Sequence, residues 1–513
     1  MKLTSYLNGA WQAGNGQGVT LINPTTGAEL ATASAEGLDL AGALAHARDV
    51  GGPALRAMSF TERGEMLKGL SKAIHEHRDA LIELATANGG NTRGDAKFDI
   101  DGCTGTLMAY AGLGAELGDK GHLADGDPVN LTRSARVQGQ HIRVPRRGAA
   151  VHINAFNFPA WGMGEKMACA LLAGMPVVSK PAPGTALLAH RVAEIIVESG
   201  LVPEGGFTFI AGDAHDLLDH VNWQDVVSFT GGSATAAKLR GHASLIAAGC
   251  PLNVEADSLN AAVLGPEADE ETYDAFIRDV HKEMTQKAGQ KCTAVRRILV
   301  PADRIDEVIE DLGDRLSRTV VGDPSQEGVH MGPLSSPLQK LRAQEGIAAL
   351  KGACSVAWTS EAALEGVADE SKGAFVRPHL MRCDAPETAP VVHELEVFGP
   401  VATVMPYDGT ADAAVALVRK GAGGLVNSLY ADNRKFLAAA MVGLADTCGR
   451  LYVVDAKTAA KGFGSGAVLP TLIHGGPGRA GAGCELGGVR GLEFYTQRCV
   501  VQGNGPLIAR LLG

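Results

Sequence analysis

Residues 148–180 read GAAVHINAFNFPAWGMGEKMACALLAGMPVVSK. The apolar run from Gly148 to Ile153 predicts a short strand, and the segment from Met163 to Ala173 predicts a helix. Gly174-Met175-Pro176 ends that helix, and residues 176–180 predict a second strand. A strand, a helix and a second strand in this order predict a parallel pair of strands joined by a crossover helix.

The same alternation continues further along the chain. Residues 186–199 predict a helix that ends at Gly200, and the segments 207–212 and 225–230 predict further strands. A second series of strands and helices runs from about residue 260 to about residue 470. We therefore predict an α/β protein with doubly wound parallel sheets, whose ligands bind at the carboxyl ends of the strands.

The segments outside these series follow other patterns. The chain up to about residue 125 is mostly helical in pattern, and residues 129–144 alternate like a hairpin with one wet face. Residues 462–491 are rich in glycine and predict a long irregular segment, which is often functional. Residues 494–501 predict a final strand.

Composition excludes several classes of function. The 513 residues suggest roughly three domains, and 45% hydrophobic with 20% charged residues is typical of a soluble protein. A formal net charge of −11 gives no reason to expect binding to nucleic acid or to an anionic membrane. Nine cysteines without a CxxC pair, and no signal peptide, predict reduced thiols in the cytoplasm and no metal site.

Cys292 is the candidate nucleophile. It lies in the run Lys287-Ala-Gly-Gln-Lys-Cys-Thr293, a loop-like setting with a cation next to the thiol. A positive charge favours the thiolate, which is the reactive form. Taken alone, a free cysteine is more often a small buried hydrophobic residue, so the assignment depends on its neighbours.

Three further features lie near predicted strand ends. The amide of Asn157, in Asn154-Ala-Phe-Asn-Phe-Pro159, is able to donate to a developing oxyanion, although a turn asparagine is the common alternative. Glu255 ends an apolar run, where desolvation raises a carboxyl pKa and suits a general base; the alternative is a solvated loop carboxylate. Phe229-Thr-Gly-Gly-Ser233 lets a backbone approach a pyrophosphate, although it also fits an ordinary strand-to-helix turn.

Together these motifs resemble the aldehyde dehydrogenase superfamily over nearly the whole chain. The matching segments are Asn157-Phe-Pro159, Lys180-Pro181, Phe229-Thr-Gly231, Glu255, Gly289-Gln-Lys-Cys292 and Glu396-Val-Phe-Gly-Pro400. The resemblance implies the aldehyde dehydrogenase fold, with a Rossmann-like cofactor domain, an α/β catalytic domain and a β-hairpin oligomerisation arm. The implied ranges are 1–128 and 148–256 for the cofactor domain, 257–470 for the catalytic domain, and 129–147 with 490–513 for the arm. The arm implies a homodimer.

The resemblance also implies a role for each matching residue. Cys292 attacks an aldehyde, Asn157 holds the oxyanion, and Glu255 activates the water that hydrolyses the thioester. Lys166 matches a lysine that supports the active-site network. The implied cofactor-binding residues are Phe156, Lys180, Ser179, Gly231, Ser233, Glu396 and Phe398.

Departures from the family pattern refine the expected cofactor and substrate. Many members have Lys-Pro-x-Glu, where the glutamate repels a 2′-phosphate, but Pro183 stands at that position here. With Lys180 and Ser179 nearby, we predict NADP in preference to NAD. Phe156, Glu165 and the segment His474-Gly-Gly-Pro-Gly-Arg479 resemble the branch that oxidises CoA-linked semialdehydes in aromatic (benzoate) catabolism. A small-molecule aldehyde carried as a CoA thioester is the predicted substrate.

Other functions remain as alternatives. A CoA-acylating enzyme would use free CoA to resolve the thioester, a general enzyme would oxidise medium-chain aldehydes, and a binding protein would need none of this chemistry. A cysteine hydrolase requires a histidine paired with Cys292. None of the 15 histidines is placed near Cys292 by a pattern in the sequence.

Overall fold

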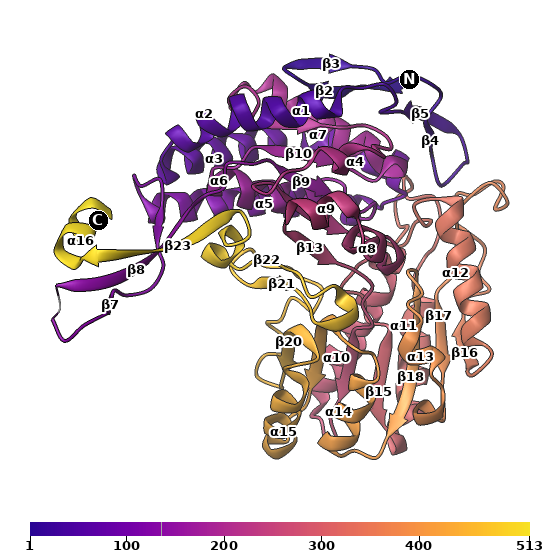
Figure 1. The fold of residues 1–513 in the computed structure, drawn as a ribbon. Helices are drawn as coiled ribbons and strands as arrows, with labels where there is room; N and C mark the ends of the chain where they lie inside the picture. Colours follow the sequence, from indigo (N-terminus) through magenta and orange to yellow (C-terminus); the bar gives the residue numbers. More distant parts are fainter. Residues whose placement is uncertain (135, 513) are drawn as a thin grey trace.

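The computed structural model describes residues 1–134 and 136–512. Positions 135 and 513, which fall in the two predicted arm segments, lie outside the described residues. Two large sheets form the body, and a smaller sheet projects from it (Figure 1). Among the described residues, none of the helices is both long and apolar enough to span a bilayer.

The first large sheet, called the N-terminal sheet, has the strand order β13-β12-β9-β10-β11-β2-β3. Its first five strands are parallel, and β2 and β3 are added antiparallel. The chain runs outward from β9 in both directions, so the order reverses between β9 and β12. The strands are β2 (Ser5–Leu7), β3 (Ala10–Gln12), β9 (Ala150–Ile153), β10 (Val177–Lys180), β11 (Phe207–Phe209), β12 (Val226–Thr230) and β13 (Leu252–Glu255).

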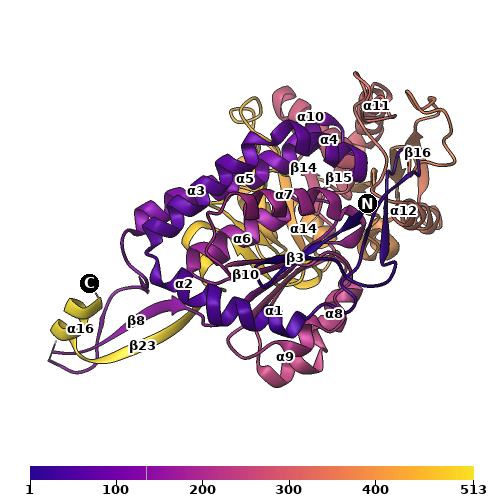
Figure 2. The ribbon, with the colours of Figure 1, turned by 90° about the horizontal axis from the view of Figure 1, so that it is seen from above.

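Helices cover both faces of the N-terminal sheet because successive strand residues point to opposite faces. Ala150 and Val177 pack into one apolar cluster, whereas Val151 and Val178 pack into another. Figure 2 shows the two groups of helices on either side of the strands. One group is α3 (Phe60–Glu76), α4 (Arg78–Gly89), α5 (Arg93–Leu117), α6 (Trp161–Ala173) and α7 (Ala186–Glu198); the other is α1 (Leu40–His46), α8 (Ser233–Arg240) and α9 (Ala243–Ala248), with α2 (Gly52–Ala57) following α1.

The second large sheet, called the C-terminal sheet, has the order β16-β17-β18-β15-β14-β19-β20 and is parallel except for the antiparallel β16–β17 pair. Its strands are β14 (Ala261–Leu264), β15 (Arg297–Pro301), β16 (Ser355–Thr359), β17 (His379–Arg382), β18 (Val401–Tyr407), β19 (Gly424–Tyr430) and β20 (Cys448–Val454). Helices again lie on both faces: α10 (Glu270–Thr285) and α11 (Ile305–Ser317) on one, and α12 (Pro337–Leu350), α13 (Val391–Glu394), α14 (Ala411–Arg419) and α15 (Arg434–Leu444) on the other. The predicted α/β class with doubly wound parallel sheets is confirmed.

The projecting sheet joins two segments that are far apart in the sequence. β8 (Val137–Pro145) pairs antiparallel with β23 (Thr496–Asn504) along its whole length, and β6 (Leu123–Ala124) and β7 (Val129–Asn130) pair with the other edge of β8. The hairpin and the late strand were both predicted from sequence. The helix α16 (Gly505–Leu512), which follows β23, was not predicted.

Two other expectations need correction. The part up to residue 125 is mostly helical, as predicted, because α1 to α5 lie within it, but its first 33 residues form strands instead. β1 (Lys2–Leu3), β4 (Val19–Ile22) and β5 (Glu29–Ala33) form a three-stranded sheet, and β2 and β3 join the N-terminal sheet. These strands are too short for an alternating pattern to be visible in sequence. The glycine-rich segment is also not wholly irregular, because β21 (Ile473–Gly475) and β22 (Cys484–Leu486) form an antiparallel pair within it.

Candidate active site

The predicted catalytic residues gather in one pocket between the two large sheets. Asn157 follows β9, Glu255 ends β13, and Cys292 lies in the loop before β15. All three line one pocket, whose other walls include Phe158, Trp161, Lys166, Thr293, Val468 and His474. This position, at the reversal of strand order in the N-terminal sheet, is where parallel sheets bind ligands.

The Cys292 loop has an unusual backbone. After α10 ends at Thr285, Lys287 and Ala288 adopt left-handed conformations with φ of 53° and 50°, which is uncommon for residues other than glycine. Gly289 follows with φ 68°, and a Cβ there would collide with the backbone of Gly399. Arg296 then binds the carbonyls of both Gly289 and Gly399 at 2.9 Å. The surrounding structure thus holds a strained turn just before the thiol.

The side chain of Asn260 fixes this loop to the C-terminal sheet. Its Nδ2 donates to the carbonyls of Cys292 at 2.8 Å and Ala294 at 2.9 Å. Its Oδ1 accepts from the backbone N–H groups of Leu425 and Val426 at the start of β19. Asn260 is only 1% exposed, so these buried partners have no water to replace it.

The cation next to Cys292 in sequence does not face the thiol. Lys291 is fully buried, and its Nζ lies 2.8 Å from Glu283 Oε2, so its charge is paired on the other side of the loop. Burial raises the pKa of the Cys292 thiol well above its usual value, and the Glu255 carboxylate raises it further. The expectation that Lys291 favours the thiolate is therefore wrong, and another group has to take the thiol proton.

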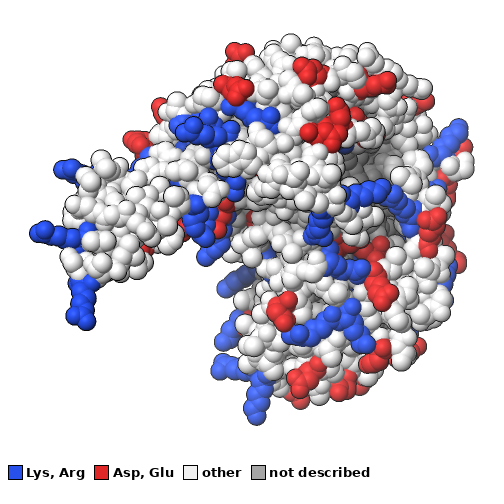
Figure 3. Space-filling model, in the orientation of Figure 1, with Lys and Arg blue, Asp and Glu red and all other residues white. Residues whose placement is uncertain are grey.

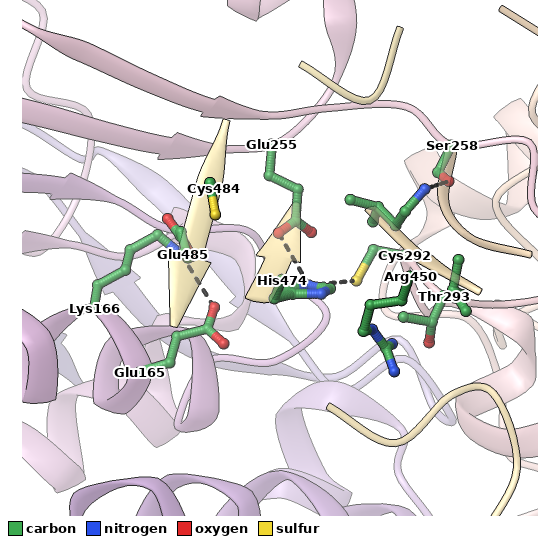
Figure 4. A network of polar contacts seen from close by, with 12 residues as sticks. Glu165, Lys166, Glu255, Ser258, Cys292, Thr293, Arg450, His474, Cys484 and Glu485 are labelled. Atoms are coloured by element: carbon green, nitrogen blue, oxygen red, sulfur yellow. Dashed lines mark hydrogen bonds and ion pairs between the residues drawn. The ribbon is translucent and has the colours of Figure 1, made fainter. Parts of the chain in front are cut away.

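His474, on β21, is the group that the sequence did not reveal. Its Nε2 lies 3.8 Å from Cys292 Sγ and 3.1 Å from Glu255 Oε2, and Figure 4 shows the imidazole between the two. No pattern in the sequence placed a histidine near Cys292; pairing of β21 with β22 brings this late residue to the pocket. The available signal was the distinctive His474-Gly-Gly segment, which the sequence linked to a branch of the family but not to catalysis.

The pKa of Glu255 is shifted in the direction opposite to the prediction. Burial would raise it, but the His474 imidazole and the Lys166 ammonium lower it to about 2. Glu255 in turn raises the pKa of His474 above its usual value, against the effect of burial. The two side chains therefore form a buried ion pair whenever His474 is protonated.

Lys166 belongs to a second buried cluster beside this pair. Its Nζ lies 3.2 Å from Glu165 Oε1 and 3.1 Å from Glu485 Oε2, and it is 1% exposed (Figure 4). Burial and the neighbouring Glu485 raise the pKa of Glu165 to about 7, although Lys166 opposes this. The two carboxylates keep Lys166 charged, and Ser228 and Asn253 donate to the other oxygen of Glu485.

The predicted nicotinamide-side residues are brought together. The rings of Phe156 and Phe398 meet edge to face at 5.7 Å, and Glu396 accepts from the backbone N–H of Ser258 at 3.1 Å. Burial raises the pKa of Glu396 to about 7, although Arg296 lies 3.6 Å away and opposes this. Among the described residues, Glu396 Oε1 and Thr230 Oγ1 are buried without a hydrogen-bond partner. Such groups fit a ligand that brings its own hydroxyl or amide groups, as a nicotinamide ribose does.

The predicted adenosine-side residues are arranged less simply. Gly231 lies between β12 and α8 and Ser233 begins α8, but Asp257 accepts both the N–H and the hydroxyl of Ser233. Lys180 Nζ lies 3.9 Å from Asp213 Oδ1 at the carboxyl end of β10. Ser179 is fully buried and accepts from Asn154, so the expected contact of its hydroxyl with a 2′-phosphate is corrected: alternation on β10 turns this side chain inward.

Glu255, Cys292 and His474 form a close cluster. One polar atom of each lies within 4.8 Å of the other two, so a proton is able to pass among them. The sequence predicted no metal, and this stays a prediction.

Comparisons with known proteins agree with this geometry. A family model described as "Aldehyde dehydrogenase family" matches residues 11–501. The 3,4-dehydroadipyl-CoA semialdehyde dehydrogenase of Aromatoleum evansii is 46% identical over 480 residues, which are 93% of each chain. Succinate-semialdehyde dehydrogenase GabD of Escherichia coli, whose name specifies NADP(+), is 29% identical over 419 residues, 80% of this chain and 81% of the relative.

Solved structures of the same family share the fold. Betaine aldehyde dehydrogenase from Staphylococcus aureus, in complex with NAD+, superposes with a TM-score of 0.83 at 24% identity. The match covers 98% of this chain and 96% of that one. The predicted aldehyde dehydrogenase fold is therefore confirmed.

The role of Asn260 leads to a prediction. Asn260→Ala leaves buried carbonyls unpaired and lets the Cys292 loop move, so we expect the free energy of unfolding to fall by about 1–3 kcal/mol. We expect kcat/KM for an aldehyde to fall by roughly 10- to 100-fold, because displacements of ~1 Å at a nucleophile cost this much. The control is Asn433→Ala, which removes the N-cap of α15 and should cost about 1 kcal/mol while leaving kcat/KM unchanged. Equal kcat/KM in the two variants would contradict this role of Asn260.

Proposed function

This chain belongs to the aldehyde dehydrogenase family, and from that premise we propose that it oxidises an aldehyde to a carboxylic acid through a covalent intermediate on Cys292. The observation that carries the proposal is the meeting of Cys292, Asn157 and Glu255 in one pocket. We assign cofactor binding to residues 1–128 and 148–256, and the catalytic domain to residues 257–470.

The first step is attack of the Cys292 sulfur on the aldehyde carbon, which leaves negative charge on the former carbonyl oxygen. Asn157 Nδ2 gives one N–H to the carbonyl of Gln290 at 3.1 Å, which orients the amide toward the Cys292 loop. Its second N–H and the backbone N–H of Cys292 are then the donors for the oxyanion. In other enzymes a donor of this type lowers the activation barrier by about 2.7–4 kcal/mol.

The second half of the reaction releases the acid. A bound nicotinamide would supply the acceptor for the hydride that leaves the aldehyde carbon, beside Phe156, Glu396 and Phe398. Glu255 then takes a proton from the water that hydrolyses the thioester. His474 and Lys166 lower the pKa of Glu255 against the effect of burial, so the carboxylate is ionised at neutral pH.

We propose a CoA-linked semialdehyde of aromatic (benzoate) catabolism, namely 3,4-dehydroadipyl-CoA semialdehyde, as the substrate. The support is the 46% identity to a relative that bears this name. Phe158, Trp161 and Val468 give the pocket apolar walls that suit the short carbon chain of the aldehyde. A general medium-chain aldehyde dehydrogenase and a CoA-acylating enzyme are the alternatives.

We propose NADP as the preferred cofactor and NAD as a weaker one. Pro183 puts no carboxylate after Lys180-Pro181, and the Lys180 ammonium would pair with a 2′-phosphate. Asp213, 3.9 Å from Lys180 Nζ, opposes this preference. We place the enzyme in the cytoplasm, where its nine free cysteines suit a reducing compartment.

Two substitutions test the covalent mechanism. Cys292→Ala removes the nucleophile and should abolish cofactor reduction, whereas Cys499→Ala, at an exposed cysteine, should not change it. Glu255→Gln should still release one equivalent of reduced cofactor per active site in a rapid burst, and then lose steady turnover by roughly 10²- to 10⁴-fold. Normal turnover of Glu255→Gln would remove Glu255 from the role of base.

An aldehyde panel run with NADP and with NAD tests substrate and cofactor together. We expect the highest kcat/KM for CoA-thioester semialdehydes with NADP, and free acid as the product whether or not free CoA is added. Lys180→Ala should lower kcat/KM for NADP roughly tenfold more than for NAD, because it removes a charge-assisted contact. Lys351→Ala, at an exposed lysine, is the control. A clear NAD preference, or formation of acyl-CoA, would overturn the corresponding part of the proposal.

We also propose a homodimer built by the projecting sheet, in which one subunit's hairpin extends a neighbour's sheet. Its exposed apolar side chains include Val129, Val500 and Leu511, and Figure 3 shows that much of this face of the arm carries no charged group. Light scattering should give the mass of two chains, and Leu511→Asp with Val500→Asp should shift it to one. Val442→Asp, at an exposed position on α15, should leave the dimer intact. A monomeric wild-type protein would contradict the proposal.

A further inference from the structure

We propose that the imidazole of His474 takes the proton of the Cys292 thiol, so that proton removal from the nucleophile and activation of water use two different bases. This assignment rests on the proposed function, because it concerns the first step of that reaction. The sequence suggested one base, Glu255. The structure places a second group on the reacting sulfur, with Nε2 3.8 Å from Sγ.

The direction of the contact favours His474 over Glu255 as the proton acceptor. The imidazole Nε2 forms a hydrogen bond with Cys292 Sγ. The same nitrogen lies 3.1 Å from Glu255 Oε2, which is ion-pair distance. His474 thus contacts the sulfur directly, while the Glu255 carboxylate, within 4.8 Å of both groups, raises the pKa of the imidazole and favours its protonated form.

The backbone around His474 is built to hold this position. β21 pairs with β22 so that His474 lies directly opposite Glu485. Two backbone hydrogen bonds join this segment to the end of β13: Ala256 N–H donates to the Ala480 carbonyl, and Gly483 N–H donates to the Val254 carbonyl. A Cβ at Gly481 or Gly483 would collide with the Val254 carbonyl, which explains why the segment needs glycine there. His474 and Glu255 are thus carried by two neighbouring backbones.

The charges around the imidazole come from every element packed against it. Glu255 on β13 and Glu165 on α6 favour the imidazolium, and Arg450 on β20 and burial oppose it. Lys166 on α6 and Glu485 on β22 lie behind Glu165 and pair with each other at 3.1 Å. Arg450 is held by the carbonyls of Ser465 and Ala467, so it keeps a fixed distance from the site. The acids outweigh the cation, and the imidazole is a stronger base than a free histidine.

The first step combines a proton transfer to His474 with attack of the sulfur on the aldehyde. Neutral His474 with its proton on Nδ1 presents the Nε2 lone pair to the thiol. The S–H bond breaks, the proton moves to Nε2, and the sulfur electron pair forms the C–S bond while the carbonyl pair moves to oxygen. The new imidazolium faces ionised Glu255, which stabilises it. Glu255 remains unprotonated and free to accept the proton of water later.

The experiment measures how fast the Cys292 thiol reacts, instead of how fast the enzyme turns over. The rate of iodoacetamide alkylation is measured on the Cys292 peptide by mass spectrometry across a range of pH. In wild-type protein we expect a rise in rate as His474 loses its proton, at a pH well below that of the thiol itself. In His474→Asn this rise should disappear. Near neutral pH the alkylation rate should fall at least roughly tenfold, because losing the histidine raises the effective pKa of the thiol by at least about one unit.

Two further variants separate proton transfer from structure. Glu255→Gln should move the rise to lower pH, since the imidazolium loses its partner; if Glu255 were the acceptor, the rise would vanish instead. His474→Gly should regain part of its alkylation rate and its cofactor reduction when free imidazole is added. His379→Asn, at a half-buried histidine of β17, is the matched control and should behave like wild type.

Each outcome decides between the two proposals. A wild-type alkylation profile in His474→Asn, or no rescue of a folded His474→Gly, would overturn the role of His474 while leaving Cys292 as nucleophile. Full cofactor reduction by Cys292→Ala would overturn the proposed function itself. A loss of the alkylation rise together with imidazole rescue supports His474 as the acceptor of the thiol proton.

Discussion

The amide of Asn260 is the contact on which the position of the nucleophile depends. One buried side chain donates to the carbonyls of Cys292 and Ala294 and accepts from the backbone of β19. Few residue types offer two donors and an acceptor at one planar group, so no apolar residue could do the same without leaving buried polar groups unpaired. Through this amide the Cys292 loop shares the rigidity of the C-terminal sheet, although the loop itself contains left-handed residues. The site is therefore fixed from below by the C-terminal sheet and faced from above by the N-terminal sheet.

Burial acts differently on each titratable group in the pocket, and the neighbours decide the result. Glu255 and Glu396 are both buried, yet the pKa of Glu255 falls to about 2 and that of Glu396 rises to about 7. The first faces His474 and Lys166, whereas Arg296, 3.6 Å from the second, does not offset its desolvation. A strand-end position in the sequence suggests only desolvation. Desolvation alone would raise the pKa of both carboxyl groups. The charge partners come from α6, from the residue just before β15 and from β21, which are distant from one another in the chain.

Much of the fold was predictable because parallel α/β sheets have a strong local pattern. The strands at residues 148–153, 176–180 and 225–230, and the helices between them, were predicted within a few residues of β9, β10, β12, α6 and α7. The short N-terminal strands were missed because two to five residues carry too little alternation. The pair β21–β22 was missed because its glycines hide a strand pattern, and those glycines are needed where the segment approaches the backbone of β13. The helix α16 was missed although its start is marked in the sequence: Asn504 accepts from the backbone N–H of Leu507, and Pro506 stands in the first turn.

The sequence by itself determined the residues that carry the chemistry at the strand ends and the family to which they belong. Asn157, Glu255 and Cys292 follow predicted strands or turns, and parallel strands must bring their carboxyl ends to one edge. Only the tertiary structure decided the charges and partners of these residues. It turned Lys291 away from Cys292 toward Glu283, turned Ser179 inward, and brought His474 from a late glycine-rich segment to the sulfur. The reason is physical: a local pattern fixes which face a side chain takes, but the distance between residues 182 positions apart depends on how all the intervening elements pack.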